Sequence, residues 1–195
     1  MTDHPTIWFL RHGETEWNAT RRIQGQMESQ LSARGREHAA EQALIMPPIL
    51  ATGPRVMVSS LGRAQQTARI ALGDTEFETD PRLMEIHAGD WQGMLYAEVM
   101  EQFPDKVTPG MRALDIFTDA PGGEGLAAFT DRVRGVIDTL DGPTVIVAHG
   151  LWGQVMRGLL RGLNHEETAM LDNLQGVVYH LENGQETILR PPSVV

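Results

Sequence analysis

The chain has 195 residues, of which 41% are apolar and 22% charged, an ordinary composition for a globular protein with a substantial core. A net charge of −10 argues against a general nucleic-acid or anionic-membrane surface, and the lack of cysteine excludes disulfides and thiolate chemistry. No apolar run approaches the roughly 20 residues of a membrane span, and no secretory signal is visible. We expect a cytoplasmic protein without nucleic-acid or membrane partners; composition leaves its oligomeric state open.

Apolar runs alternate with helix-like stretches, a pattern typical of a mixed or parallel sheet flanked by helices. In chain order, the predicted elements are a strand over residues 6–10, a helix over 33–46, a strand over 55–58, a helix ending near residue 72, a helix over 124–140, a strand over 144–148 that leads into another helix, and closing strands over 175–181 and 186–189. The two closing strands flank a turn at residues 182–185.

Local signals mark several of these boundaries. Ser32 can cap the first long helix, and Pro47-Pro48 should end it. Ser59 or Ser60 can cap the second, and Gly73 should end it. Residues 85–121 show no regular period, and their aromatic side chains are scattered among glycine and proline. We interpret this stretch as an insertion or cap near the functional site, within a single domain that spans residues 1–195.

Three apolar strands each lead directly into candidate functional residues. Arg11-His12 follows the first strand, Ser59–Arg63 follows the second, and His149-Gly150 follows the strand over 144–148. In open α/β sheets, the carboxyl ends of the strands and the helix N-termini beyond them form the ligand crevice. Segments far apart in the sequence can therefore meet there, and their arginines and free backbone N–H groups would suit an anion.

A set of motifs then carries a family resemblance. The motifs are Arg11–Thr15 (RHGET), Trp17-Asn18, Gln24-Gly25, Ser59–Ala68 (SSLGRAQQTA), Leu83–Gly93 (LMEIHAGDWQG), Pro121–Glu124 (PGGE) and Val147–Gly150 (VAHG). Together and in this order they resemble the histidine phosphatase superfamily, in its phosphoglycerate-mutase-like branch. The resemblance covers the chain from Ile7 to about Tyr179. It implies a three-layer α/β/α sandwich with a mostly parallel sheet.

The resemblance also implies roles for individual residues. His12 is similar to the family's nucleophile and Glu85 to the proton donor of its phosphatases, with Arg11, Arg63 and His149 completing the catalytic set. The residues that it places on the substrate phosphate are Arg11, Asn18, Gln24, Gly25, Arg63, His149 and Gly150. Arginine matches phosphate geometry with permanently charged paired donors, which agrees with this assignment.

The expected function is a metal-independent phosphatase that hydrolyses a small phosphorylated metabolite through a phosphohistidine on His12. In class it would be a histidine acid phosphatase-type phosphomonoesterase. No cofactor is expected, and the remaining histidines lack the spacing of metal ligands. One alternative is a phosphoglycerate mutase, although residues 86–120 contain only Lys106 and Arg112 as basic residues. A catalytically inactive binding or regulatory protein is the other, although the core histidines and arginines are all present.

Overall fold

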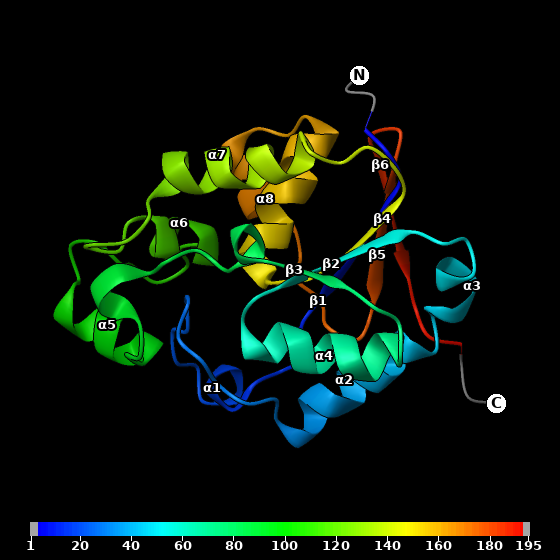
Figure 1. Cartoon of the computed structure of the whole chain (residues 1–195). Coiled ribbons are helices and arrows are strands. Elements are labelled where there is room, and N and C mark those ends of the chain that lie inside the picture. Colours follow the sequence, from blue (N-terminus) through cyan, green and yellow to red (C-terminus); the bar gives the residue numbers. More distant parts are fainter. Residues whose placement is uncertain (1–3, 193–195) are drawn as a thin grey trace.

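A six-stranded sheet runs through the middle of the protein in the computed structural model, which describes residues 4–192 (Figure 1). Its strands are β1 (Ile7–Arg11), β2 (Arg55–Ser59), β3 (Glu78–Asp80), β4 (Thr144–Ala148), β5 (Val178–Glu182) and β6 (Gln185–Leu189), in the spatial order β3-β2-β4-β1-β5-β6. The first four are parallel, whereas β5 and β6 are antiparallel additions at one edge. The predicted mostly parallel sheet is confirmed.

Both faces of the sheet are buried, and this requires helices on both sides. Along β4, Val145 and Val147 belong to one apolar cluster, whereas Ile146 and Ala148 belong to another. Side chains alternate between the faces of a strand, so a fully apolar strand such as TVIVA must be covered twice. The result is the predicted α/β/α sandwich.

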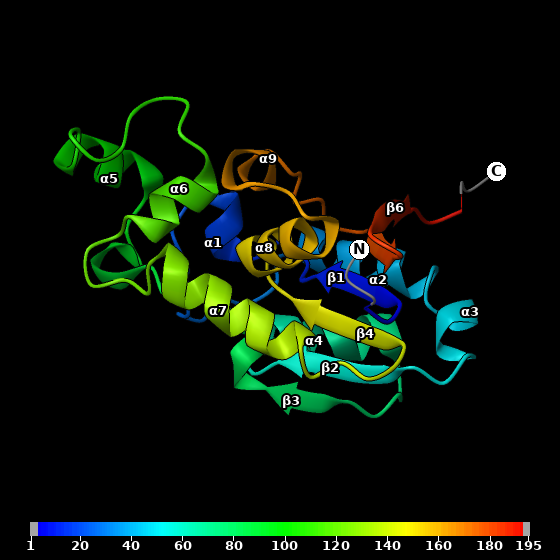
Figure 2. The same ribbon diagram turned by 90° about the horizontal axis from the view of Figure 1, so that it is seen from above.

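Helices cover the two faces in separate groups (Figures 1 and 2). One face carries α2 (Ala33–Ala43), α3 (Pro47–Leu50) and α4 (Gly62–Leu72), and the other carries α7 (Leu126–Ile137) and α8 (Gly150–Arg161). The short helices are α1 (Glu16–Ala19), α5 (Tyr96–Gln102), α6 (Ala113–Thr118) and α9 (His165–Ala169), with 3₁₀ turns at Pro81–Leu83 and Gly89–Trp91. Among residues 4–192, no helix has the length and apolar character needed to cross a membrane.

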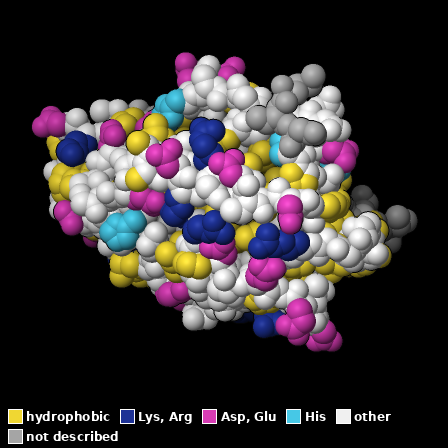
Figure 3. Space-filling model, turned by 45° about the horizontal axis from the view of Figure 1, so that its top comes forward, with side chains coloured by type: hydrophobic (Ala, Val, Ile, Leu, Met, Phe, Trp, Pro, Cys, Tyr) yellow, Lys and Arg dark blue, Asp and Glu magenta, His cyan; other side chains and the backbone are white. Residues whose placement is uncertain are grey.

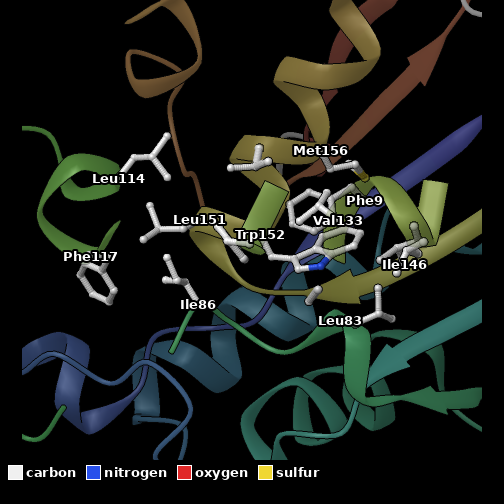
Figure 4. Packing of buried hydrophobic residues seen from close by; sticks show 14 of the residues in the cluster. Phe9, Leu83, Ile86, Leu114, Phe117, Val133, Ile146, Leu151, Trp152 and Met156 are labelled. Atoms are coloured by element: carbon white, nitrogen blue, oxygen red, sulfur yellow. The ribbon is translucent and has the colours of Figure 1, made fainter. Parts of the chain in front are cut away.

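The irregular segment over residues 85–121 contains α5 and α6, which extend to one side of the sandwich (Figure 1). Its apolar side chains join the same cluster as the sheet and α8. Figure 4 shows Leu114 and Phe117 of α6 near Ile86 and Leu151, beside the buried ring of Trp152. The segment is therefore anchored through shared apolar packing, and it lies next to the start of α8.

Several predicted boundaries were wrong. The first long helix ends at Ala43 rather than Met46, and Pro47 starts α3 because proline fits the first helical position. Neither Ser59 nor Ser60 caps α4; its N-cap residue is Leu61, and the Glu28 carboxylate accepts a hydrogen bond from Gly62 N at 2.8 Å. By contrast, Ser32 does cap α2 by accepting from Gly35 N at 3.0 Å.

Other differences concern elements with weak sequence signals. Strand β3 was not predicted, because Glu78–Asp80 is a short polar edge strand without apolar alternation. Helix α7 is shorter at both ends than the predicted 124–140. Strand β5 begins at Val178 rather than residue 175, since Gly176 adopts φ of 76°, which lies outside the extended region of a strand. The predicted final turn is present between β5 and β6.

Basic and acidic side chains are interspersed on the face of the surface drawn in Figure 3. This mixing fits a protein whose net charge is acidic but whose arginines are widely distributed. Any local positive potential must therefore come from a particular cluster of side chains.

Candidate active site

A pocket of about 260 Å³ lies at the carboxyl ends of β1 and β4. It is the place at which parallel strands and the helices that follow them leave room for a ligand. Most residues singled out in the sequence line it, namely Arg11, His12, Asn18, Gln24, Gly25, Arg63, Glu85 and Gly150. His149 does not line the pocket but lies directly beside it, with its ring centroid 5.1 Å from that of His12.

His12 is held as a neutral imidazole with a defined tautomer. Its Nδ1 lies 2.7 Å from the carbonyl oxygen of Gly13, and only a protonated Nδ1 can donate to that acceptor. Its Nε2 accepts from Arg63 Nε at 3.3 Å, so the lone pair of Nε2 is available. Burial lowers the pKa of His12 well below its ordinary value, and the charges of Arg63 and Arg11 add to this effect.

Gly13 gives the main chain after β1 its close contact with α2. A Cβ at Gly13 would lie 2.0 Å from the carbonyl oxygen of Gly35, which is an impossible contact. The backbone N–H of Gly13 also donates to Thr67 Oγ1 of α4 at 3.0 Å. The glycine of the RHG motif is thus needed to seat His12 between two helices.

Arg63 is fixed by its own helix and by the loop over residues 25–27. It lies in the first turn of α4, is 1% exposed, and donates to the carbonyl oxygens of Met27 (2.9 Å) and Gly25 (2.8 Å). Burial lowers its pKa to about 10, so the guanidinium stays charged at neutral pH. Gly25 adopts φ of 53°, and a Cβ there would lie 2.2 Å from Gln92 Oε1.

Arg11 occupies the last position of β1 and reaches across the pocket. One of its terminal nitrogens donates to the carbonyl oxygen of Asn173, while its Nε is buried and has no partner within the described chain. Neither Arg11 nor Arg63 forms an ion pair in residues 4–192. Two cations without a compensating carboxylate contact favour an anion in this pocket.

Glu85 caps the N-terminus of α8 from a distant part of the sequence. Its Oε1 accepts from the backbone N–H groups of Trp152 (3.0 Å) and Ile86 (3.1 Å), and its Oε2 accepts from Leu151 (3.0 Å). Burial raises the pKa of Glu85 above its ordinary value, whereas the Leu151 hydrogen bond and the charge of Arg63 oppose that rise. These effects act on the pKa of Glu85 in opposite directions, so the charge of a bound ligand can determine whether the carboxyl group is protonated.

His149 is the N-cap residue of α8 and is fully buried. Its Nε2 lies 2.7 Å from Ser59 Oγ, which also accepts a hydrogen bond from Leu61 N. One hydrogen bond thus joins Nε2 to the Ser59 hydroxyl, and the Nδ1 of His149 is buried without a hydrogen-bond partner in the part of the chain described. His149 therefore has one unengaged ring nitrogen close to His12.

The remaining predicted contacts differ in how they are engaged. Asn18 uses its side-chain oxygen in a capping box with Thr15, which holds α1 at the pocket. Gln24 has a buried side-chain oxygen without a partner, and Gly150 begins α8. The structure brings Asn18, Gln24 and Gly150 to the same pocket as Arg11 and His12.

Comparisons with known proteins agree with this geometry. Residues 7–191 match the model of the histidine phosphatase superfamily (branch 1). A glucosyl-3-phosphoglycerate phosphatase of Mycolicibacterium vanbaalenii is 39% identical over 173 residues, covering 79% of this chain and 73% of the relative. The chain belongs to the histidine phosphatase superfamily.

Two further relatives show the range of this histidine phosphatase's similarity. A Serratia proteamaculans protein named "probable phosphoglycerate mutase GpmB" is 36% identical, covering 74% of this chain and 69% of the relative. The crystal structure of an α-ribazole phosphatase from Shigella flexneri superimposes with a TM-score of 0.74 at 25% identity, covering 96% of each chain. Phosphatase and mutase names therefore both occur among the relatives.

The histidine phosphatase pocket also contains residues that the sequence reasoning missed. They are Arg22, Tyr96, Ala113, Phe117, Leu151 and Asn173. Arg22 lies two residues before the Gln24-Gly25 motif, a proximity that could have drawn attention to it. Tyr96 and Phe117 were visible only as scattered aromatics, because no sequence period shows which way an irregular segment turns.

Within residues 4–192, no three His, Asp or Glu side chains cluster in a way that could hold a metal ion. The positive charges at the pocket come from arginine side chains instead.

The stability of this histidine phosphatase should fall as the pH drops below about 6.5, because His12 and His149 are buried as neutral imidazoles. Below that pH the unfolded chain binds protons that the folded protein excludes. Each group then costs up to about 1.4 kcal/mol per pH unit until the pH reaches its lowered pKa. Denaturant titrations at successive pH values would measure this. In His149→Asn, the free energy of unfolding should fall less steeply with decreasing pH than in the wild type, since carboxylates contribute equally to both proteins. Equal slopes would contradict the expectation.

Proposed function

We propose that this histidine phosphatase is a metal-independent phosphomonoesterase that hydrolyses a small phosphorylated metabolite through a phosphohistidine on His12. The observation that carries the proposal is the state of His12. It is a neutral imidazole whose Nε2 lone pair faces a pocket that Arg11 and Arg63 line, and neither of these arginines forms an ion pair within the described chain. A nucleophile for phosphorus must be unprotonated, and its surroundings must attract the phosphate.

In the first step, His12 Nε2 forms a bond to phosphorus while the bond from phosphorus to the ester oxygen breaks. Arg11 and Arg63 stabilise the negative charge that spreads over the equatorial oxygens. For this step, the Arg63 Nε–H turns from Nε2 to a phosphoryl oxygen; its present distance of 3.3 Å marks a weak hydrogen bond that is easily exchanged. His149, whose ring centroid lies 5.1 Å from that of His12 and whose Nδ1 has no partner in residues 4–192, can add a further hydrogen bond.

Glu85 supplies the proton that the leaving alkoxide takes up. Of its two oxygens, Oε2 accepts only one backbone hydrogen bond, whereas Oε1 accepts two, so Oε2 is the better site for a proton. A phosphate dianion that enters the pocket raises the pKa of Glu85 through charge repulsion and favours the protonated form. In the second step, water attacks phosphorus, the bond to Nε2 breaks, and Glu85 takes the proton of that water.

The segment over residues 85–121 acts in this proposal as a cap within a single domain. It contributes Tyr96, Ala113 and Phe117 to the pocket that Arg11 and Arg63 also line. These side chains would contact the alcohol part of the substrate rather than its phosphate. The cap therefore sets substrate preference, while the residues that end the strands perform the chemistry.

The mutase alternative is less well supported by the pocket. Among the pocket-lining residues, the segment after Glu85 contributes no lysine or arginine, since Lys106 and Arg112 do not line it. A mutase must hold its phosphorylated substrate in the pocket long enough for the phosphoryl group on the enzyme to be transferred to another hydroxyl of that substrate. A purely binding role would not need the neutral nucleophile that His12 presents.

The test is release of inorganic phosphate from a panel of phosphorylated sugars, acids and alcohols after exhaustive treatment with a chelator. We expect undiminished release without added metal and without bisphosphoglycerate. Activity that disappears on chelation and returns with magnesium or zinc would contradict metal independence. Interconversion of phosphoglycerates that depends on bisphosphoglycerate, without release of phosphate, would instead establish a mutase.

A further inference from the structure

Arg22 is a third cation in the pocket, separate from Arg11 and Arg63. It follows α1, and its backbone forms a bridge with Leu95 of the cap segment. One terminal nitrogen donates to the carbonyl oxygen of Gly93, and the guanidinium lies 5.5 Å from the ring centroid of Trp17. These two contacts fix the side chain in place but leave most of its N–H groups without a protein acceptor in residues 4–192.

No carboxylate compensates this charge. Arg22 forms no ion pair within the described chain, although acidic residues outnumber basic ones by 26 to 16 in the sequence. Among the lysines and arginines of residues 4–192 that form no ion pair, only Arg11, Arg22 and Arg63 are not exposed, and all three line the pocket. The half-buried guanidinium of Arg22 is therefore available to a ligand in the pocket.

The charge balance of the pocket points the same way. Arg11, Arg22 and Arg63 line it together with a single carboxyl group, Glu85. When Glu85 is protonated for catalysis, a phosphate dianion neutralises only two of the three arginines. One positive charge then remains, and a substrate with a second anionic group would satisfy it.

The surroundings of Arg22 place this surplus charge on the side of the substrate's alcohol group. Tyr96 and Phe117 of the cap lie in the same pocket, with ring centroids 6.1 Å apart, and close it with aromatic surface. Burial raises the pKa of Tyr96, so its hydroxyl remains a neutral hydrogen-bonding group. Arg22 is thus the charged group among the residues that would contact this part of the substrate.

We propose that Arg22 binds a second anionic group of the substrate, so that the substrate is a phosphate monoester that also carries a carboxylate or another phosphate. The inference rests on the proposed function in one respect, since it assumes that Arg11 and Arg63 hold the phosphoryl group to be transferred. Arg22 would be a specificity residue: it would contact the substrate but take no part in bond breaking.

Matched ligand pairs test this. 3-Phosphoglycerate differs from glycerol 3-phosphate by a carboxylate in place of a hydroxymethyl group, and fructose 1,6-bisphosphate differs from fructose 6-phosphate by a second phosphate. Calorimetric dissociation constants in a His12→Asn background avoid turnover. We expect the ligand with the additional anion to bind about ten- to a hundredfold more tightly in at least one pair, as a charge-assisted hydrogen bond predicts. The pair that shows the larger difference in affinity, which we call the affinity gap, identifies the anion.

Arg22→Gln should remove this affinity gap while leaving the affinity for the ligand without the additional anion nearly unchanged. Arg22→Lys keeps the charge and should keep part of the gap. Arg21→Gln is the control, since Arg21 is an exposed neighbour of the same charge that lies outside the pocket lining; it should keep the whole gap. Equal affinities within both pairs, or equal weakening of both members by Arg22→Gln, would overturn the proposal. Because binding is measured without turnover, failure here is distinct from failure of the phosphatase reaction.

Discussion

We expect a phosphoryl label on His12 when a turnover reaction with labelled substrate is stopped in alkali, and no label in His12→Asn. Phosphohistidine survives base and is lost in acid, which distinguishes it from a phosphate ester of serine or threonine. The variant should also lose kcat/KM by on the order of 10⁴-fold or more, because removal of a nucleophile abolishes the two-step pathway. This is the largest effect that the site geometry predicts.

The structure explains why His12 and not His149 should carry the label. His12 lines the pocket, and its Nε2 accepts only a long hydrogen bond of 3.3 Å from Arg63, whereas His149 does not line the pocket and its Nε2 is hydrogen-bonded to Ser59 at 2.7 Å. His180→Asn is a suitable control, since His180 lies on β5 and stacks on Trp8 away from the pocket. A label that persists in His12→Asn and disappears in His149→Asn would reverse the assignment.

Glu85→Gln should lower kcat/KM for an alkyl phosphate by about 10²–10⁴-fold, and far less for nitrophenyl phosphate. An alkoxide is a poor leaving group and needs the proton, whereas nitrophenolate leaves readily without one. The ratio kcat/KM is the informative quantity, since it covers the steps up to formation of the phosphoenzyme and not its later hydrolysis. The difference between the two substrates therefore isolates proton donation.

A structural role for Glu85 must be separated from this one. The carboxylate makes no ion pair with Arg11 or Arg63 in the described structure, but it caps α8 through two backbone hydrogen bonds and accepts a third from Ile86. In Glu85→Gln, the amide NH₂ would face one of these N–H donors, which should lower the thermal stability and affect both substrates alike. Equal losses on the two substrates would favour this structural role. Asp90→Asn is the matched control, because Asp90 follows in the same segment but does not line the pocket.

Short-range signals accounted for much of the fold. Buried strands such as Thr144–Ala148 were evident because five consecutive apolar or β-branched residues require burial on both faces. The order of strand ends then indicated where His12, Arg63 and His149 would converge. Strand β3 and helices α5 and α6 escaped prediction, since they are short, and their formation depends on packing against elements that precede or follow them in the chain.

The sequence by itself determined the family resemblance, the α/β class and the identity of the residues proposed for the reaction, because these depend on residue type and order along the chain. The tertiary structure alone decided their chemical states. The lowered pKa of His12 follows from burial and from Arg63, which is 51 positions away in the chain, and the Nε2 of His149 is hydrogen-bonded to a serine 90 positions away. The environment of Glu85 depends on backbone N–H groups of α8, and the availability of Arg22 depends on the lack of an acidic neighbour. Protonation and charge pairing arise from contacts between distant segments, and such contacts form only when the chain is folded.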